Sequence, residues 1–156
     1  MRLFAILAVV GAVGVGGVIS ANGVEVWAPA GWHRVASAGD GPVSDPRTVL
    51  VVGTPGVRAR LTVCQIAAYR IPPDGAVVVV VGWKPARGIN ARGRTALAKL
   101  TSVRRPSFEC FKGRGAAAQV ELRGRVYQVN VMVGDRASKQ RIGDALDVAR
   151  SFDLKR

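Results

Sequence analysis

The sequence is short of the residues from which most active sites and metal sites are built. It has one histidine, His33, and two cysteines, Cys64 and Cys110, in 156 residues. A zinc site takes three or four such ligands, so we expect no metal site. The chain also lacks a G-x-S-x-G, a P-loop, a G-x-G-x-x-G and an H-E-x-x-H motif. These absences exclude the enzyme classes that the motifs mark.

Acidic residues are few as well, and no pattern pairs them. The chain has ten Asp and Glu residues, and glycoside hydrolysis needs two carboxylates that face each other across a cleft. A Ser-His-Asp triad would have to use His33, which directly follows the Gly31-Trp32 turn. We therefore expect no catalytic residues, no cofactor and no enzymatic activity.

The first 21 residues have the layout of a secretory signal peptide. Arg2 supplies one positive charge, residues 3–19 are apolar, and Ser20-Ala21 are small. The alternative is a retained membrane anchor formed by residues 3–19, which is at the short limit for a spanning helix. We expect an extracytoplasmic protein, secreted or associated with the cell envelope. Its mature part, residues 22–156, has the length of a single domain.

Export changes the interpretation of the two cysteines. In an oxidising compartment, two cysteines and no others indicate one disulfide bond, here between Cys64 and Cys110. The chain-entropy model gives a closed loop of this length about 4 kcal/mol of stabilisation. The alternatives are two buried free thiols, or a cysteine nucleophile for which His33 is the sole base.

Short apolar runs separated by turn residues predict strands in the first half of the domain. Residues 48–53 form a compact apolar run. Residues 57–63 alternate, which predicts a strand with Arg58, Arg60 and Thr62 facing water. Residues 76–81 contain five consecutive valines, which predicts a strand at the centre of the sheet with both faces covered.

The last third of the chain predicts a hairpin followed by a helix. Residues 119–122 and 125–133 flank Arg123-Gly124, a two-residue connection. A helix is expected over residues 137–152 with Asp135 as its N-cap. Its apolar stripe comprises Ile142, Ala145, Leu146, Ala149 and Phe152. The fold class is therefore α+β: an antiparallel sheet of about six strands with a C-terminal helix packed on one face.

Three groups of residues carry a resemblance to known proteins. They are residues 29–32 (PAGW), residues 72–77 (PPDGAV), and the late pair GR…GDRA and ALDVARSF between residues 124 and 152. In this combination the chain resembles small exported proteins of high-GC bacteria, which have no assigned activity. It is also similar, at fold level, to domains of the PsbP/Mog1 type, which open with a Pro-x-Gly-Trp turn. The resemblance implies a non-catalytic binding or assembly role.

Basic charge is the one clue to function. The chain has 23 Lys and Arg against ten acidic residues, a formal net charge of +13. Residues 84–114 contain nine basic residues and one acidic residue, Glu109. We expect residues 84–106 to form a long loop with one helical turn near residues 95–100. The candidate anion-binding residues are Arg87, Arg92, Arg94, Lys99, Arg104, Arg105, Lys112 and Arg114.

The sequence therefore predicts an exported, non-catalytic binding module. Its Arg-rich loop would contact an anionic polymer of the cell envelope or a membrane surface with anionic lipid headgroups. Specific nucleic-acid recognition is not expected, because the basic segment has no stacking platform and no recognition motif. The alternative is a protein-interaction or assembly module in which the basic charge is incidental.

Overall fold

The computed structural model describes residues 14–39, 45–84, 93–105 and 110–156. Arg87 and Arg92 lie outside these residues. Within the described part, the chain forms ten strands and two helices: β1 (Gly17–Ala21), β2 (Val24–Ala28), β3 (His33–Arg34), β4 (Arg47–Gly53), β5 (Arg58–Ala59), β6 (Tyr69–Arg70), β7 (Ala76–Trp83), α1 (Thr95–Ala98), β8 (Arg114–Leu122), β9 (Arg125–Val133), α2 (Lys139–Arg150) and β10 (Asp153–Leu154).

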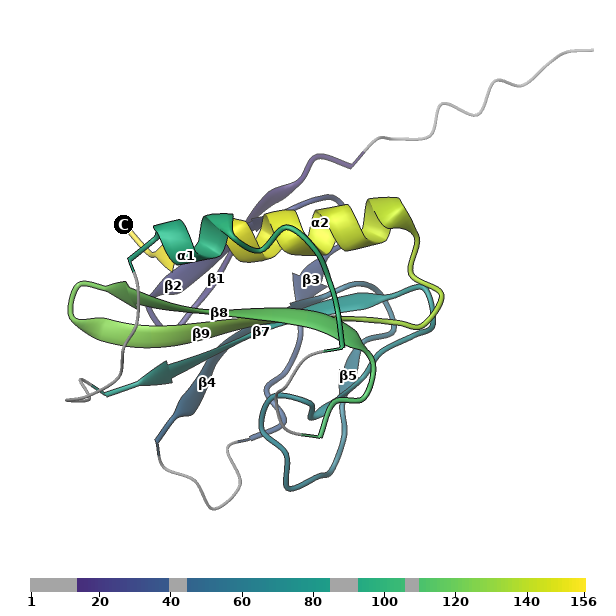
Figure 1. Cartoon of the computed structure of the whole chain (residues 1–156), viewed down its shortest axis with the longest axis horizontal. Helices are drawn as coiled ribbons and strands as arrows, with labels where there is room; N and C mark the ends of the chain where they lie inside the picture. The colour runs from purple at the N-terminus through teal and green to yellow at the C-terminus, as the bar shows by residue number, and fades with distance from the viewer. Residues whose placement is uncertain (1–13, 40–44, 85–92, 106–109) are drawn as a thin grey trace, which may run out of the picture.

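The strands are divided between a main sheet and two smaller ones. The main sheet has five antiparallel strands in the order β3-β4-β7-β9-β8. A second sheet has the order β1-β2-β10, and β5 pairs with β6. The α+β class is confirmed, but the prediction of one sheet of about six strands is wrong. The division arises because α2 crosses the main sheet, so that β10 emerges beside β2 and pairs there (Figure 1).

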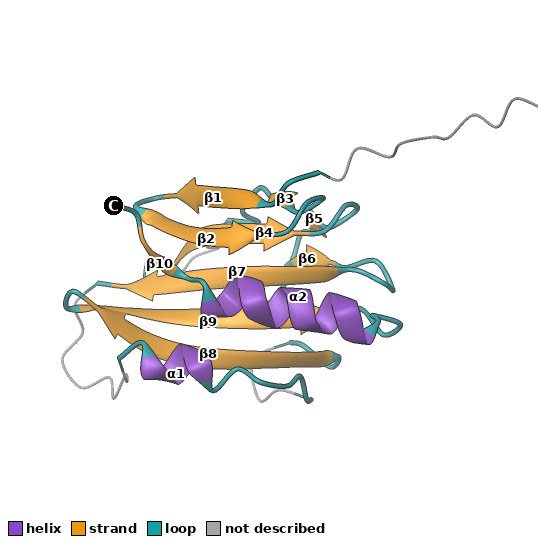
Figure 2. Cartoon of the chain, turned by 90° about the horizontal axis from the view of Figure 1, so that it is seen from above, coloured by secondary structure: helices purple, strands orange, loops and turns teal. Residues whose placement is uncertain are grey.

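The central strand of the main sheet is β7, as its valine run predicts. Residues 77–81 are all fully buried. Because side chains alternate along a strand, Val78 and Val80 join the core beneath α2, whereas Val77, Val79 and Val81 join a second core on the opposite face. Figure 2 shows α2 across β7 and β9 and α1 over β8, on the same face of the sheet.

The C-terminal helix covers that face, although it starts later than predicted. Ser138 is its N-cap, and the Ser138 hydroxyl accepts the backbone N–H of Arg141 at 3.1 Å. Asp135 is not the cap, because the Arg136 N–H is bonded to the carbonyl of Pro73 at 2.8 Å and the chain is not yet helical there. The predicted stripe is confirmed, with four of its members fully or almost fully buried: Ala145, Leu146, Ala149 and Phe152.

The hairpin prediction is confirmed at its turn and extended at its first strand. Arg123 and Gly124 both have positive φ, 50° and 72°, as a two-residue turn between twisted strands requires. Strand β8 begins at Arg114 and not at residue 119. The residues that it adds, Gly-Ala-Ala-Ala after Arg114, have low strand propensity, so the sequence pattern did not show them.

The second core is covered by residues 57–71, most of which are not in strands. The strand predicted over residues 57–63 is wrong: its regular part is β5 alone, paired with β6. The Arg60 N–H bonds to the carbonyl of Ala68 at 2.9 Å, which continues the β5–β6 pairing by one residue, and residues 61–67 form the connecting loop. Ile66, Ala67 and Ala68 then pack on the valines of β7, together with Val57 and Cys64.

Strand β1 lies within the segment that we assigned to the signal peptide. Its five residues pair antiparallel with β2, and Ile19 and Ala21 pack against the core beneath α2. The ordered fold thus begins before Val24, while the cleavage site stays a prediction. Among the described residues, no helix is long and apolar enough to cross a membrane.

We expect a chain that starts at Asn22 to be less stable than one that starts at Gly14. The shorter chain loses the β1 ladder and the partly buried Ile19 side chain, which together are worth about 1–3 kcal/mol. Urea denaturation of the two purified chains measures this difference. Equal midpoints would show that β1 contributes nothing to the fold.

Candidate anion-binding surface

The candidate basic residues are spread over several elements of the structure. Six of the eight lie in the described residues. Arg94 contacts Asp153, Lys99 and Arg104 line a cleft beside β8, and Arg105 and Lys112 are exposed. The bridge between Arg104 and Gly115 brings Arg104 close to Arg114. Anion binding by these residues stays a prediction.

Two candidate arginines have structural roles. A guanidinium nitrogen of Arg94, which precedes α1, lies 2.6 Å from a carboxylate oxygen of Asp153 in β10. Arg114, at the start of β8, donates to the backbone carbonyls of Asp135 and Gly134 at 3.3 and 3.4 Å. These contacts tie the start of α1 and the start of β8 to the C-terminal segment, so both arginines also stabilise the fold.

The contact between Arg94 and Asp153 lowers the pKa of the Asp153 carboxyl. Partial burial raises the pKa of Asp153, but the hydrogen bond and the charge of Arg94 oppose it, and the net pKa lies below the ordinary value. The carboxylate is consequently charged, and paired with Arg94, over the whole neutral range.

Lys99 and Arg104 line a cleft of about 540 Å³ beside β8. One wall consists of residues 99–102 and Arg104, and the other of β8 residues 115–119. Arg150 of α2 holds the first wall in place, because its guanidinium donates to the carbonyl of Leu100. Leu100 itself is buried in the core beneath α2.

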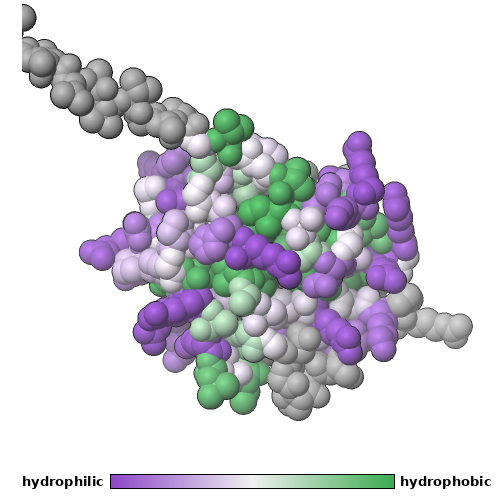
Figure 3. Space-filling model, turned by 180° about the vertical axis from the view of Figure 1, so that it is seen from behind, coloured by the Kyte–Doolittle hydropathy of each residue, from purple (hydrophilic) through white to green (hydrophobic). Residues whose placement is uncertain are grey.

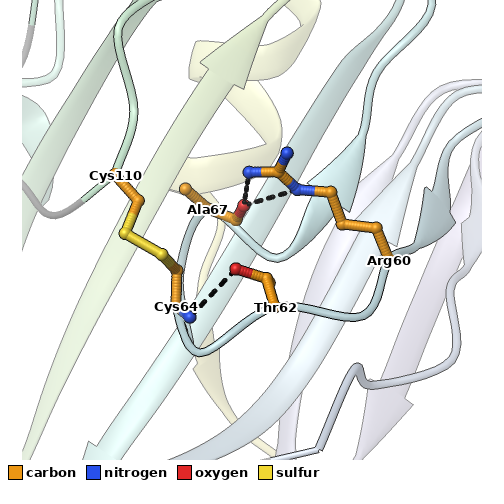
Figure 4. Close-up of a disulfide and its surroundings, with 5 residues drawn as sticks. All are labelled: Arg60, Thr62, Cys64, Ala67 and Cys110. Carbon is orange, nitrogen blue, oxygen red and sulfur yellow. Dashed lines mark hydrogen bonds between the residues drawn. A yellow bond between two sulfur atoms is a disulfide. The ribbon is translucent and has the colours of Figure 1, made fainter.

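Cys64 and Cys110 form a disulfide, as predicted, with their Cα atoms 6.3 Å apart. The bond joins the loop between β5 and β6 to the segment that precedes β8 (Figure 4). Disulfides of this kind indicate an oxidising, extracytoplasmic environment. Phe111, next to Cys110, packs against the second core and extends the attachment beyond the two sulfur atoms.

The same loop carries two apolar side chains that have no place in either core. Leu61 and Val63 have exposed fractions of 106% and 92%. We call these two residues the apolar tip. The loop forms the lower end of the molecule in Figure 1, and Figure 3 shows strongly apolar side chains protruding at the lower end. An alternating strand would have buried both residues, but they lie in the loop beyond the β5–β6 pairing and are exposed to water.

Hydrogen bonds on both sides of the apolar tip fix its conformation. The Arg60 guanidinium donates to the carbonyl of Ala67 at 2.9 and 3.3 Å. The backbone N–H of Cys64 donates to the hydroxyl of Thr62 at 3.2 Å (Figure 4). Since the disulfide holds Cys64 as well, the loop is braced at both ends of the Leu61–Val63 turn.

Basic side chains flank the apolar tip. Arg58 and Arg70 are register partners on β5 and β6, the two strands that the loop connects, and both are exposed. Lys112, two residues after Cys110, is also exposed. Arg58 and Arg70 were not among the sequence candidates, because they are distant in sequence from the basic segment and the disulfide alone relates the two regions. We call Arg58, Arg70 and Lys112 the tip cations.

The single histidine and the possible metal ligands of the described residues lie apart from one another. His33 is exposed on the two-residue strand β3. No group of three His, Cys, Asp or Glu residues is close enough to hold a metal ion within the described ranges. No protein-family model matches the chain, and no curated protein matches it either.

Replacing Arg94 by Gln should remove a small, pH-dependent stabilisation. The pair is partly exposed, so we expect a loss of less than about 1 kcal/mol near neutral pH. Because the folded-state pKa of Asp153 is lowered, the contribution is complete above the unfolded pKa of about 3.9 and disappears as the pH falls through the folded value. Urea denaturation at several pH values measures this, with the exposed Arg136→Gln as control. A difference that persists at low pH would contradict the account.

Removal of the disulfide should destabilise the fold strongly. For Cys64→Ala with Cys110→Ala, we expect the free energy of unfolding to fall by about 2–5 kcal/mol, because a 46-residue separation no longer closes in the unfolded state. Thermal unfolding of the double variant, beside oxidised and reduced wild type, gives this value. If the double variant and the reduced wild type have the same free energy of unfolding, the loss comes from the missing disulfide bond and not from the alanine substitutions.

Proposed function

We propose that the protein is an exported, non-catalytic module that binds membranes with anionic lipid headgroups through the apolar tip and the tip cations. The observation that carries this proposal is the exposure of Leu61 and Val63 on a disulfide-braced loop. Two large apolar side chains fully exposed on one loop are costly to leave in water, and exposed apolar patches mark membrane or protein contacts.

The arrangement combines the two forces that bind peripheral proteins to a bilayer. Each Lys or Arg near an anionic surface contributes about 1 kcal/mol. Transfer of a Leu or Val side chain from water to an apolar medium contributes about 1.5–3 kcal/mol. Three tip cations and two apolar side chains thus supply enough free energy for reversible binding without a spanning segment.

A bilayer explains the apolar tip better than a soluble polyanion does. Wall phosphates, acidic glycans and extracellular DNA would all attract the basic residues, and the net charge of +13 would favour each of them. None of them offers an apolar phase to Leu61 and Val63. Export agrees with the disulfide, which forms in the compartment where the outer leaflet is accessible.

Substitution of the apolar tip tests the proposal. We expect Leu61→Ser with Val63→Ser to reduce binding to phosphatidylglycerol-containing vesicles about a hundredfold or more, since each side chain loses about 1.5 kcal/mol of transfer free energy. Stability should not change, because neither residue packs in a core. Vesicle co-sedimentation gives the partition coefficient. A matched control is Trp27→Gln, a half-exposed apolar residue on β2 at a distance from the loop.

The tip cations are tested in the same assay. Arg58→Gln, Arg70→Gln and Lys112→Gln should together weaken binding about a hundredfold or more at low salt and reduce its salt dependence. Arg136→Gln with Lys139→Gln on the α2 side serves as the charge-matched control. The membrane proposal would be overturned if the apolar-tip variant bound vesicles as tightly as the wild type does. It would also be overturned if the protein bound soluble polyphosphate as tightly as vesicles and neither set of substitutions weakened that binding.

A further inference from the structure

The cleft beside β8 lies along an open strand edge, a feature that the membrane proposal does not use. Strand β8 is an edge of the main sheet and is nine residues long. Natural edge strands are usually short, or carry Pro, Lys or a bulge that prevents further pairing. The sequence of β8, RGAAAQVEL, has no Pro and no Lys, and its register with β9 runs without a bulge.

The direction of the open backbone groups follows from one bridge. Gly115 exchanges both of its backbone hydrogen bonds with Arg104, at 2.6 and 2.7 Å. Its N–H and C=O therefore point away from β9. Because the pattern repeats every second residue in an antiparallel pair, Ala117, Gln119 and Glu121 direct their backbone groups the same way. Within the described residues these outward groups have no hydrogen-bond partner.

The cleft lies along this open edge and extends over Gln128 of β9, which also lines it. Five consecutive β8 residues, 115–119, line it. Consecutive side chains of a strand point to opposite faces, so a space that touches all of them must run beside the backbone. The wall formed by residues 99–102 therefore leaves a gap in which the next strand of the sheet would lie.

This gap is preformed and accessible to a backbone. Leu100 is anchored in the core and by Arg150, and Arg104 is held by its bridge to Gly115. The β8 residues that line the gap beyond Gly115 begin with three alanines, which let another chain approach closely. The volume of about 540 Å³ falls within the range of about 300–1,000 Å³ typical of binding clefts.

Charge complementarity indicates the occupant. Lys99 and Arg104 line the cleft, and among the described residues its lining includes no acidic side chain. A second copy of this chain would bring its own β8 into the cleft, with Arg114 at one end and Arg123 just beyond the other. These arginines would be repelled by Lys99 and Arg104. An extended acidic segment would place carboxylates there instead. To pair with residues 117–121 it must be extended over about 13 Å.

We propose that the open edge of β8 binds an extended acidic segment of a partner protein as an added strand, with Lys99 and Arg104 pairing with its carboxylates. The backbone groups of Ala117, Gln119 and Glu121 supply the hydrogen bonds, and the cations select the charge of the ligand. This site is separate from the apolar tip, so the two proposals stand or fall independently.

The test uses the full oxidised chain and a capped peptide of alternating Glu and Val, long enough to span residues 117–121. Fluorescence anisotropy measures its affinity, and amide hydrogen exchange by NMR locates it. We expect saturable binding with new protection at Ala117, Gln119 and Glu121. A peptide with N-methylated alternate amides, or with Lys in place of Glu, should bind at least about tenfold more weakly, because strand hydrogen bonds or charge pairing are lost.

Variants of the protein complete the test. Ala117→Pro removes an outward N–H without breaking the β8–β9 ladder, and we expect it to weaken peptide binding about tenfold. Ala117→Val retains the N–H and is the matched control. Lys99→Gln with Arg104→Gln should weaken binding similarly, whereas Lys139→Gln should not. Vesicle binding by all of these variants should stay at the wild-type level.

Several outcomes would overturn the inference. One is no binding of the Glu-Val peptide, and another is equal binding of the N-methylated peptide, which would indicate charge attraction alone. New hydrogen-exchange protection at the apolar tip in place of β8 would also contradict the inference. So would binding of soluble polyphosphate at the cleft with the same affinity as the Glu-Val peptide. If Ala117→Pro does not fold, the N-methylated peptide with wild-type protein decides the question.

Discussion

The two-sided burial of β7 is the constraint on which the rest of the structure depends. Five consecutive valines leave the strand without a polar face, so that a cover is needed on both sides of the sheet. On one side α2 and the small sheet of β1, β2 and β10 supply it. On the other side no helix is present among the described residues, and the cover is the segment from Val57 to Ile71. That segment contains only two short strands, β5 and β6.

A cover with so little regular structure needs another source of order, and the Cys64–Cys110 bond provides it. The bond fastens the loop between β5 and β6 to the chain before β8 and brings two distant parts of the sequence together. A consequence is that the loop can present Leu61 and Val63 to solvent without losing its shape. Covering the core and exposing an apolar tip are thus two results of one crosslink.

The sequence predicted most of the elements whose signal is local. The valine run located the central strand, Arg123-Gly124 located the hairpin turn, and the stripe ending at Phe152 located the helix face. Non-local features were not predictable in the same way. The alternation of residues 57–63 indicated a strand, but the pairing with β6 ends at Arg60, and Leu61 lies in the loop that follows, exposed to solvent.

The candidate site shows the same division. Counting charges identified Lys99 and Arg104, which do line a cleft, but it gave the same weight to Arg94 and Arg114, which are bonded within the fold. It missed Arg58 and Arg70 altogether. The sequence shows how many cations the chain has, whereas their pairing with Asp153 or with backbone carbonyls depends on contacts between segments that are far apart in the chain.

The central claim is that a disulfide-braced apolar tip enters an anionic bilayer. The most direct measurement is the paramagnetic broadening of methyl NMR signals by headgroup-labelled lipid in phosphatidylglycerol nanodiscs, with oxidised protein. The account predicts the strongest broadening at Leu61 and Val63 and little at the buried methyl groups of Val78 or Leu146. Broadening centred on any other surface, or none at all, would contradict it.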